Sequence, residues 1–236
     1  MPSLLLAASP WGAWPPATCL PDDCFCEALG KGLVRQPANT WSSVAFVVVA
    51  LLVVSRARRD PQSGAAPLPA AEHWLFVSSL ALVGLGSAFY HASLTFIGQV
   101  LDVSGMYLVA TFILLHRLGP RWGLRPISGV LGFVAANAAL MAAQVTTPSL
   151  RRVVFGALLV VALAVEWRAA RPGRLWLARG AGLMAAAFVI WVLDRWRLMC
   201  APESLLQGHA AWHVLGAAAA ACLYRSYEAD ARLKLP

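Results

Sequence analysis

Seven long apolar runs, separated by short polar stretches, dominate the pattern of hydrophobic and polar positions along the chain. They lie at about residues 40–55, 73–92, 98–116, 126–145, 151–167, 177–197 and 208–225. Crossing the hydrocarbon core of a bilayer takes about 20 mostly apolar residues in a helix, and the run VAFVVVALLVV (44–54) has no polar face to turn toward water. The pattern predicts an all-α integral membrane protein, built as a bundle of seven transmembrane helices.

The composition agrees with this prediction and argues against a large water-soluble core. Of the 236 residues, 59% are hydrophobic and 13% are charged, whereas about 25% are charged in a typical soluble domain. The first residues lack the basic segment and the long apolar run of a signal peptide, so we expect them to be retained. We therefore divide the chain into an outer N-terminal segment (1–39), a seven-helix domain (40–225) and a cytoplasmic tail (226–236).

The basic residues predict the orientation of the helices. Thirteen of the 19 Lys and Arg residues follow the first, third, fifth and seventh runs, and the other six lie on the opposite side. Basic residues gather on the cytoplasmic side of a membrane, so the N-terminus is predicted outside and the C-terminus inside, as in a bacterial inner membrane. The net charge of +8 then reflects topology and contact with anionic lipids, and nucleic-acid binding is not predicted.

Polar and ionisable side chains inside the apolar runs are predicted to gather near the outer side. They are Ser87, His91, Asp102, Asp194, His209 and His213. Four different runs contribute, and each residue falls in the outer turns of its predicted helix. An ionisable group in hydrocarbon costs roughly 2.5–3.5 kcal/mol on insertion scales, so a functional role is the default interpretation. The cluster predicts a site at this depth.

Three histidines of this cluster have the spacing of a metal site. His209 and His213 are four residues apart, so both rings project from one face of a helix, and His91 supplies a third ligand. Three neutral imidazoles with a fourth position for water form a common catalytic zinc arrangement. Zinc lowers the pKa of a coordinated water toward about 7 and polarises a carbonyl oxygen. His73 and His116 lie at the opposite ends of their runs and fit interfacial side chains.

The remaining polar side chains suggest a reaction. Asp102 is placed to take a proton from water and return it to a leaving amine, and Ser87 is placed to donate a hydrogen bond to an oxyanion. These roles describe hydrolysis of an acyl bond, most naturally an amide, and a site bounded by lipid favours a lipid substrate. Asp194 has two interpretations, which are a residue that orients a metal ligand and a partner of Arg195 or Arg197 in a salt bridge.

Four of the five cysteines map to the outer side, where an oxidising environment favours disulfides. A Cys26–Cys200 bond would hold the N-terminal segment over the site, and Cys19–Cys24 is a second candidate pair. A zinc site built on the C-x-C motif of Cys24 and Cys26 is an alternative. Cys222 lies deep in the last run.

Several segments together resemble one known family. They are CFCE (24–27), QPANTWSS (36–43), GSAFYHASLTFIGQVLD (86–102), WVLDRWRLMC (191–200) and HAAWH (209–213). They are similar to the alkaline ceramidases and their relatives in the CREST superfamily of membrane hydrolases, which includes the adiponectin and progestin receptors. The combination S-x-x-x-H, an Asp eleven residues later and a final H-x-x-x-H is specific, and the resemblance covers roughly residues 24–225.

The resemblance implies a seven-helix bundle with zinc on the three histidines. It also implies catalytic roles for Ser87 and Asp102, a disulfide like Cys26–Cys200, and cleavage of the N-acyl bond of ceramide to sphingoid base and fatty acid. One part of the family pattern is incomplete. Eukaryotic alkaline ceramidases carry an acidic calcium site that begins D-W-x-E, and this chain has Cys-Phe where Asp-Trp would stand.

The oxygen ligands that remain for calcium are Asp23, Glu27 and Asn39. Calcium prefers several carboxylates, so this departure weakens the prediction of a calcium site and of the eukaryotic substrate.

Two other classes of membrane protein share some of these features. A receptor or signalling protein would hold structural zinc on the same residues without turning over ceramide. An ion or proton transporter would need polar residues along a whole path, and the inner halves of the runs are apolar apart from a few residues such as Asn137. We therefore expect a zinc-dependent hydrolase of linear lipid amides, with the receptor as the alternative.

Overall fold

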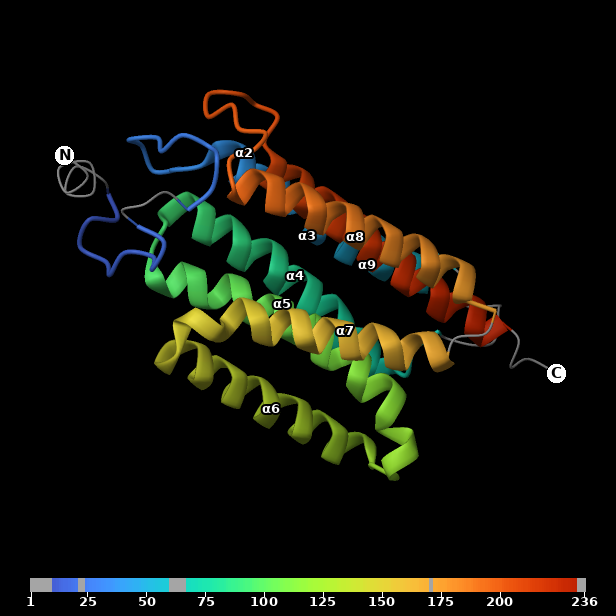
Figure 1. Ribbon diagram of the computed structural model, residues 1–236. Helices are drawn as coiled ribbons and strands as arrows, with labels where there is room; N and C mark the ends of the chain where they lie inside the picture. The colour runs from blue at the N-terminus through green and yellow to red at the C-terminus, as the bar shows by residue number, and fades with distance from the viewer. Residues whose placement is uncertain (1–9, 21–23, 60–66, 170–171, 233–236) are drawn as a thin grey trace.

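A computed structural model describes residues 10–20, 24–59, 67–169 and 172–232 of the chain. Its long elements are all helices, as Figure 1 shows. The helices are α2 (Pro37–Ser42), α3 (Val44–Arg59), α4 (Ala70–Ser93), α5 (Phe96–Leu118), α6 (Pro126–Thr146), α7 (Arg151–Ala169), α8 (Arg174–Arg195) and α9 (Gly208–Arg232). Two 3₁₀ turns, η1 (Pro120–Trp122) and η2 (Pro148–Leu150), lie on either side of α6.

Six segments of the described chain are long and apolar enough to cross a membrane. They are Pro37–Ala57, Ala70–Ser93, Phe96–Leu118, Pro126–Thr146, Pro148–Ala169 and Arg174–Arg195. The predicted all-helical membrane protein is therefore confirmed with six candidate spans. The seventh predicted run lies in α9, whose 25 residues reach about 37 Å, but polar residues at both of its ends shorten the apolar middle. That α9 crosses the membrane stays a prediction, as does the orientation of the bundle.

Two of the differences between the predicted boundaries and the observed helices change the division of the chain. Helix α2 begins at Pro37, before the predicted run, because Pro is well suited to the first turn of a helix. Helix α9 continues to Arg232, so the segment predicted as a tail begins as helix. Residues 1–9 of the N-terminal segment, 60–66 of the segment between α3 and α4 and 233–236 of the predicted tail lie outside the described residues.

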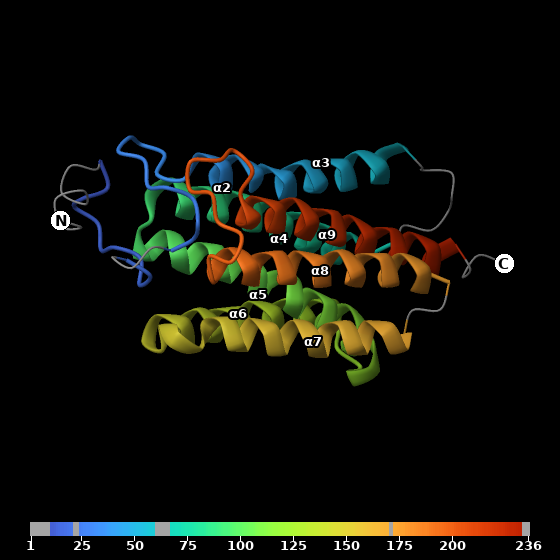
Figure 2. The same ribbon diagram turned by 45° about the horizontal axis from the view of Figure 1, so that its top comes forward.

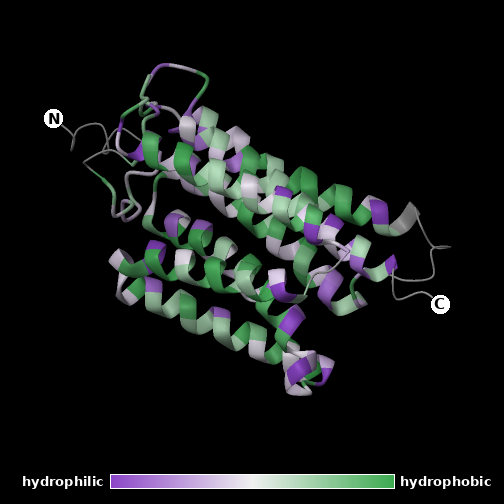
Figure 3. Ribbon diagram, turned by 45° about the vertical axis from the view of Figure 1, so that its right-hand side comes forward, coloured by the Kyte–Doolittle hydropathy of each residue, from purple (hydrophilic) through white to green (hydrophobic). Residues whose placement is uncertain are grey.

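The long helices lie side by side along one direction (Figures 1 and 2). Helix α4 packs along α5, α8 packs along α9, and α3 contacts both α4 and α9. Helices α6 and α7 lie against α5. Hydrophobic residues predominate along the helices (Figure 3), and the main core cluster includes Phe76, Leu80, Phe112, Tyr224 and Tyr227.

Two glycines allow α4 and α5 to approach at the level of the backbone. A Cβ atom on Gly86 would lie 2.9 Å from the carbonyl oxygen of Leu101, and one on Gly105 would lie 2.7 Å from the Cα atom of Val83. Small residues permit this close packing of helices in membranes. The contact places the C-terminal turns of α4 beside the N-terminal turns of α5, so Ser87 and Asp102 come from adjacent helix surfaces.

The described N-terminal segment lies over the end of the bundle where α4 ends and α5 begins. The amide of Ala17 donates to the carbonyl oxygen of Leu94 at 2.9 Å, and the amide of Phe96 donates to the carbonyl oxygen of Pro15 at 2.8 Å. Helix α9 begins at the same end, which we call the histidine end because His91, His209 and His213 lie there. The other end of the bundle is called the opposite end.

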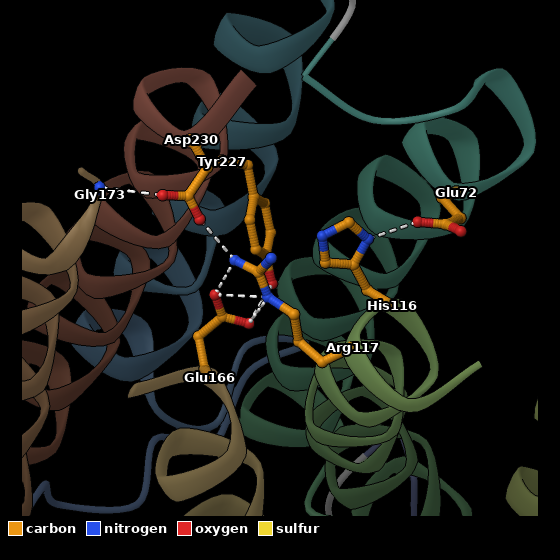
Figure 4. Close-up of polar contacts among 7 residues, drawn as sticks. All are labelled: Glu72, His116, Arg117, Glu166, Gly173, Tyr227 and Asp230. Carbon is orange, nitrogen blue, oxygen red and sulfur yellow. Dashed lines mark hydrogen bonds and ion pairs between the residues drawn. The ribbon is translucent and has the colours of Figure 1, made fainter. Parts of the chain in front are cut away.

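The opposite end holds a buried ionic cluster that joins three helices (Figure 4). Glu166 of α7 is fully buried, and its carboxylate accepts two hydrogen bonds from Nε of Arg117 on α5, at 2.8 and 2.9 Å. Nη2 of Arg117 also contacts Glu166 and donates to Asp230 of α9 at 2.8 Å. The other oxygen of Asp230 accepts the amide of Gly173, in the turn before α8, at 3.0 Å. The cluster ties α5, α7 and α9 together.

The two histidines predicted to be interfacial lie at this opposite end. Nδ1 of His116 is 2.5 Å from a carboxylate oxygen of Glu72, and both residues are labelled in Figure 4. The ring of His73 contacts Trp74 and Tyr224. Neither histidine belongs to the group of potential metal ligands found among the described residues.

Candidate metal centre

His91, His209 and His213 meet at the histidine end. His91 lies in the last turn of α4, and His209 and His213 lie one turn apart at the start of α9. All three side chains are buried, and their ligating nitrogen atoms lie within 4.8 Å of one another. The structure thus brings together the three residues that the sequence predicted as metal ligands.

The spacing of the ring nitrogens fits one metal ion. Nε2 of His209 lies 3.1 Å from Nε2 of His91, and the ring centroid of His213 lies 4.6 Å from that of His209 and 5.1 Å from that of His91. Two nitrogens at tetrahedral positions, each about 2.0–2.1 Å from zinc, are about 3.3 Å apart. Small ring movements would therefore place three nitrogens around one ion.

Hydrogen bonds to Nδ1 orient the rings of His91 and His213, so that Nε2 of each ring points into the cluster. Nδ1 of His91 is 2.8 Å from Oε1 of the buried Gln36, and a carbonyl oxygen only accepts, so Nδ1 carries the proton and Nε2 keeps its lone pair. Nδ1 of His213 lies 2.8 Å from the hydroxyl of Ser42 and 3.3 Å from that of Ser43. Metal-ligating histidines usually have such a partner on the second nitrogen.

His209 is held by its backbone and by an aromatic neighbour. Phe25 stacks on the ring of His209, with centroids 3.7 Å apart. The amide of His209 donates to Oδ1 of Asp194 at 3.2 Å, and the amide of Cys26 donates to Oδ2 at 3.3 Å. Nδ1 of His209 is buried with no hydrogen-bond partner in the described chain. Asp194 therefore positions His209 through the backbone, at the positive N-terminal end of α9.

Ser87 and Asp102 extend the cluster beyond the histidines. Ser87 is buried on α4, one turn before His91, and its Oγ lies 3.3 Å from Nε2 of His213. Asp102, half-buried in the second turn of α5, has a carboxyl group that interacts with the Ser87 side chain. Asp102 is therefore the polar neighbour of Ser87 on the adjacent helix.

Disulfides hold the N-terminal segment over the histidines. Cys26 is bonded to Cys200, in the loop between α8 and α9, and Cys19 is bonded to Cys24. The sulfurs of Cys24 and Cys26 are both used, so the alternative of a zinc site on this pair is wrong. Cys222, within α9, is free.

Of the three predicted calcium ligands, Asn39 lies within α2 and Glu27 lies beside its first turn. Oε1 of Glu27 accepts the amide of Ala38 at 2.6 Å, and Oε2 accepts the amide of Asn39 at 2.9 Å. Glu27 thus satisfies two amides at the start of α2 that the helix leaves unpaired. Burial raises the pKa of the Glu27 carboxyl, and these hydrogen bonds oppose the rise. The side-chain amide of Asn39 is buried without a partner among the described residues, Asp23 lies outside those residues, and calcium binding stays a prediction.

Sequence reasoning missed the residues that hold the histidine rings. Gln36, Ser42 and Phe25 contact the rings directly, and all three come from the N-terminal segment and α2. A signal was present, because α2 places polar residues at the start of an otherwise apolar span. Only the fold shows which of them face a histidine.

Two comparisons with known proteins add to this geometry. The family model described as Ceramidase matches residues 33–230, a range that contains the three histidines, Ser87 and Asp102. No curated protein matches the chain. The family match confirms the resemblance seen in the sequence.

Proposed function

The chain belongs to the Ceramidase family, and from this membership we propose that it is a zinc-dependent amidase that works within the membrane. Its substrate would be ceramide or a closely related N-acyl lipid, and the products would be a sphingoid base and a fatty acid. The observation that carries the proposal is the buried group of three histidines with ligating nitrogens within 4.8 Å of one another.

Zinc is the metal that this set of ligands favours. All three ligands are imidazole nitrogens, which suit zinc and other transition metals, whereas calcium and magnesium prefer oxygen. Three protein ligands leave a fourth position open, which is typical of catalytic zinc sites. When bound there, zinc would activate a water and polarise the acyl carbonyl group.

The residues beside the histidines would move the proton and stabilise charge. We assign to Asp102 the transfer of a proton from the attacking water to the leaving nitrogen, which general acid–base catalysis requires. We assign to Ser87 the donation of a hydrogen bond to the oxygen that gains negative charge. The support is their position, since the Ser87 hydroxyl lies 3.3 Å from Nε2 of His213 and the Ser87 side chain interacts with the Asp102 carboxyl group.

The N-terminal segment, which lies over the histidines, would limit access of bulk water to the reaction. Phe25 lies against the rings of His91 and His209, and the Cys26–Cys200 bond fixes this part of the chain to the loop before α9. Exclusion of water strengthens the electrostatic interactions on which the reaction depends. A lipid substrate would then reach the site from within the bilayer.

The test is turnover of N-acyl sphingoid bases by detergent-purified protein. We expect fatty acid release that a zinc chelator abolishes and added zinc restores. His213→Ala should lose most of its zinc and its activity, while His73→Ala, which changes a histidine at the opposite end, should keep both. Stoichiometric zinc without turnover of any lipid amide would refute the amidase proposal and support a receptor with structural zinc.

A further inference from the structure

A small pocket lies beside the end of α4, on the outer face of the histidine end. Trp11, Trp14, Arg35, Ser93 and Thr95 are among the residues that line it, and its volume is about 60 Å³. By the same kind of measure, a cavity of about 10–15 Å³ holds one water. The pocket therefore accepts a polar group of a few atoms and not a whole lipid. None of these five side chains belongs to the histidine group.

Arg35 carries a buried positive charge without a counterion in the part of the chain that the structure describes. The residue is only 2% exposed, and its Nε atom has no hydrogen-bond partner. The ion pairs of the described residues do not include Arg35. Burial lowers the pKa of the Arg35 guanidinium with no carboxylate opposing the effect. Arginine nevertheless stays charged, and an unpaired buried charge is costly.

Capping of α4 does not account for this charge. A cation near the C-terminus of a helix can bind its last carbonyl oxygens. Here the carbonyl oxygens of Ala92 and Leu94 already accept backbone amides, from Arg35 at 3.0 Å and from Ala17 at 2.9 Å. Within the described chain the Arg35 guanidinium makes no hydrogen bond to these oxygens, and Arg35 lines the pocket.

A hydroxyl pair adds a second donor to the same pocket. Oγ of Ser93 lies 2.9 Å from Oγ1 of Thr95, and Thr95 Oγ1 also accepts the amide of Gly98. Two hydroxyls that share one hydrogen bond leave one of their two hydrogens unused. No described residue accepts that hydrogen. A guanidinium and a hydroxyl donor in one pocket match the acceptor oxygens of a phosphate or carboxylate.

The two tryptophans indicate that the anion belongs to an amphiphile. Trp14 is 48% exposed, and its ring meets that of Trp11, which in turn contacts Phe89 on α4. Tryptophan favours the membrane interface, where one part of the ring contacts acyl chains and the other meets polar headgroups. An anionic group beside these rings would stand at headgroup depth.

We propose that this pocket is a binding site for the phosphate of an anionic phospholipid, held by Arg35 and by the hydroxyl pair of Ser93 and Thr95. Trp11 and Trp14 would contact the glycerol and the upper acyl chains. The site is separate from the proposed amidase reaction, and it gives the protein a bound lipid of defined charge at the edge of the histidine end.

The experiment compares lipids by their effect on thermal unfolding of the full chain in an uncharged detergent. Phosphatidylglycerol should raise the unfolding temperature of the wild-type protein, and phosphatidylcholine should not, because its headgroup has no net charge. Glycerol 3-phosphate alone should have little effect. A shift with glycerol 3-phosphate as large as that with phosphatidylglycerol would overturn the lipid assignment in favour of a small-anion site.

Arg35→Met removes the charge and keeps most of the side-chain volume. Without anionic lipid this variant should unfold at the same temperature as wild type or higher, since a buried unpaired charge has been replaced by an apolar group. It should then lose the response to phosphatidylglycerol. Lys31→Met, which removes an exposed basic residue of the same segment, should keep the full response.

Two further results decide the proposal independently of folding effects. Trp14→Leu, at a partly exposed position, should fold normally and weaken the response to phosphatidylglycerol. Native mass spectrometry should find one more bound phosphatidylglycerol on wild type than on Arg35→Met.

An equal response of wild type and Arg35→Met to this lipid would overturn the proposal. A lower unfolding temperature of Arg35→Met without lipid would also overturn it, because the guanidinium would then be structural.

Discussion

Gln36 shows how a single residue holds His91, one of the three candidate metal ligands, in position. The side-chain oxygen Oε1 of Gln36 lies 2.8 Å from Nδ1 of His91. This contact places the ring proton on Nδ1 and turns Nε2 toward His209. The backbone amide of Gln36 also donates to the backbone carbonyl oxygen of His91, at 3.1 Å. One residue thus holds both the ring and the backbone of the ligand that comes from α4.

Gln36→Leu should weaken metal binding without removing a ligand. Loss of a partner on the second nitrogen of a ligating histidine typically costs about 10–100-fold in metal affinity or activity. Competition with a zinc chelator would measure the change. Gln99→Leu is a suitable control, because this buried amide bonds Tyr90 at the same end and does not touch a histidine ring. Equal zinc affinity in wild type and Gln36→Leu would contradict the assignment.

Asp102 can be separated from the metal ligands by substitution. Asp102→Asn keeps the shape of the side chain and leaves the three histidines intact, so zinc content should stay near that of wild type. Turnover should fall by about 10²–10⁴-fold if Asp102 transfers the proton. Ser87→Ala should cost on the order of 10²–10³-fold if its hydroxyl stabilises an oxyanion. Metal analysis and activity on the same preparations distinguish the roles, and loss of zinc in Asp102→Asn would make Asp102 an orienting residue of the metal site.

At the scale of helices, hydrophobicity predicted the six candidate spans, and spacing predicted that the three histidines would meet. The apolar runs marked the helices because lipid contact demands nonpolar surfaces, and the H-x-x-x-H spacing placed His209 and His213 on one face of α9. The N-terminal segment was less predictable. Its contacts with α4 and α9 join residues far apart in sequence, such as Cys26 and Asp194, and no periodicity encodes them.

The ionic cluster at the opposite end was also missed by sequence reasoning. Arg117 directly follows the third apolar run, among the thirteen basic residues on the side predicted to be cytoplasmic, and Glu166 stands at the end of the fifth run. Figure 4 shows the two side chains facing each other between α5 and α7, with Asp230 of α9 beside them. Such a pairing depends on which helices become neighbours, and hydropathy carries no information about helix order.

Removal of Arg117 should destabilise the packing of α5, α7 and α9. Arg117→Leu would leave Glu166, which is 0% exposed, as a buried charge without its partner, and breaking such a pair typically costs about 3–5 kcal/mol. The double variant Arg117→Leu/Glu166→Leu should recover much of this loss. Arg225→Leu, which breaks a more exposed pair with Glu228, should cost about 1 kcal/mol or less. Thermal unfolding in detergent compares the stability of wild type with that of the three variants. Equal losses of stability in Arg117→Leu and Arg225→Leu would contradict this account.

At the scale of the whole molecule, the two ends of the bundle have different characters. The histidine end carries the three buried histidines, the disulfides and Arg35. The opposite end carries the Arg117 cluster and the loops that contain most of the basic residues. Disulfides form in oxidising compartments and basic loops stay in the cytoplasm, so both features predict the same orientation, with the histidine end outside.

This orientation can be tested with single cysteines in a Cys222→Ala background. Ser149→Cys, at the exposed turn between α6 and α7, should react with a membrane-impermeant thiol reagent in intact cells because it lies at the histidine end. Arg121→Cys, at the exposed turn between α5 and α6, should be protected until the membrane is permeabilised. Mass tagging of the denatured protein shows how far each introduced cysteine has been labelled. Wild-type protein with intact disulfides is the control for labelling of native cysteines. The reverse pattern of labelling would turn the metal centre toward the cytoplasm, and a lipid substrate would then have to be supplied from the inner leaflet.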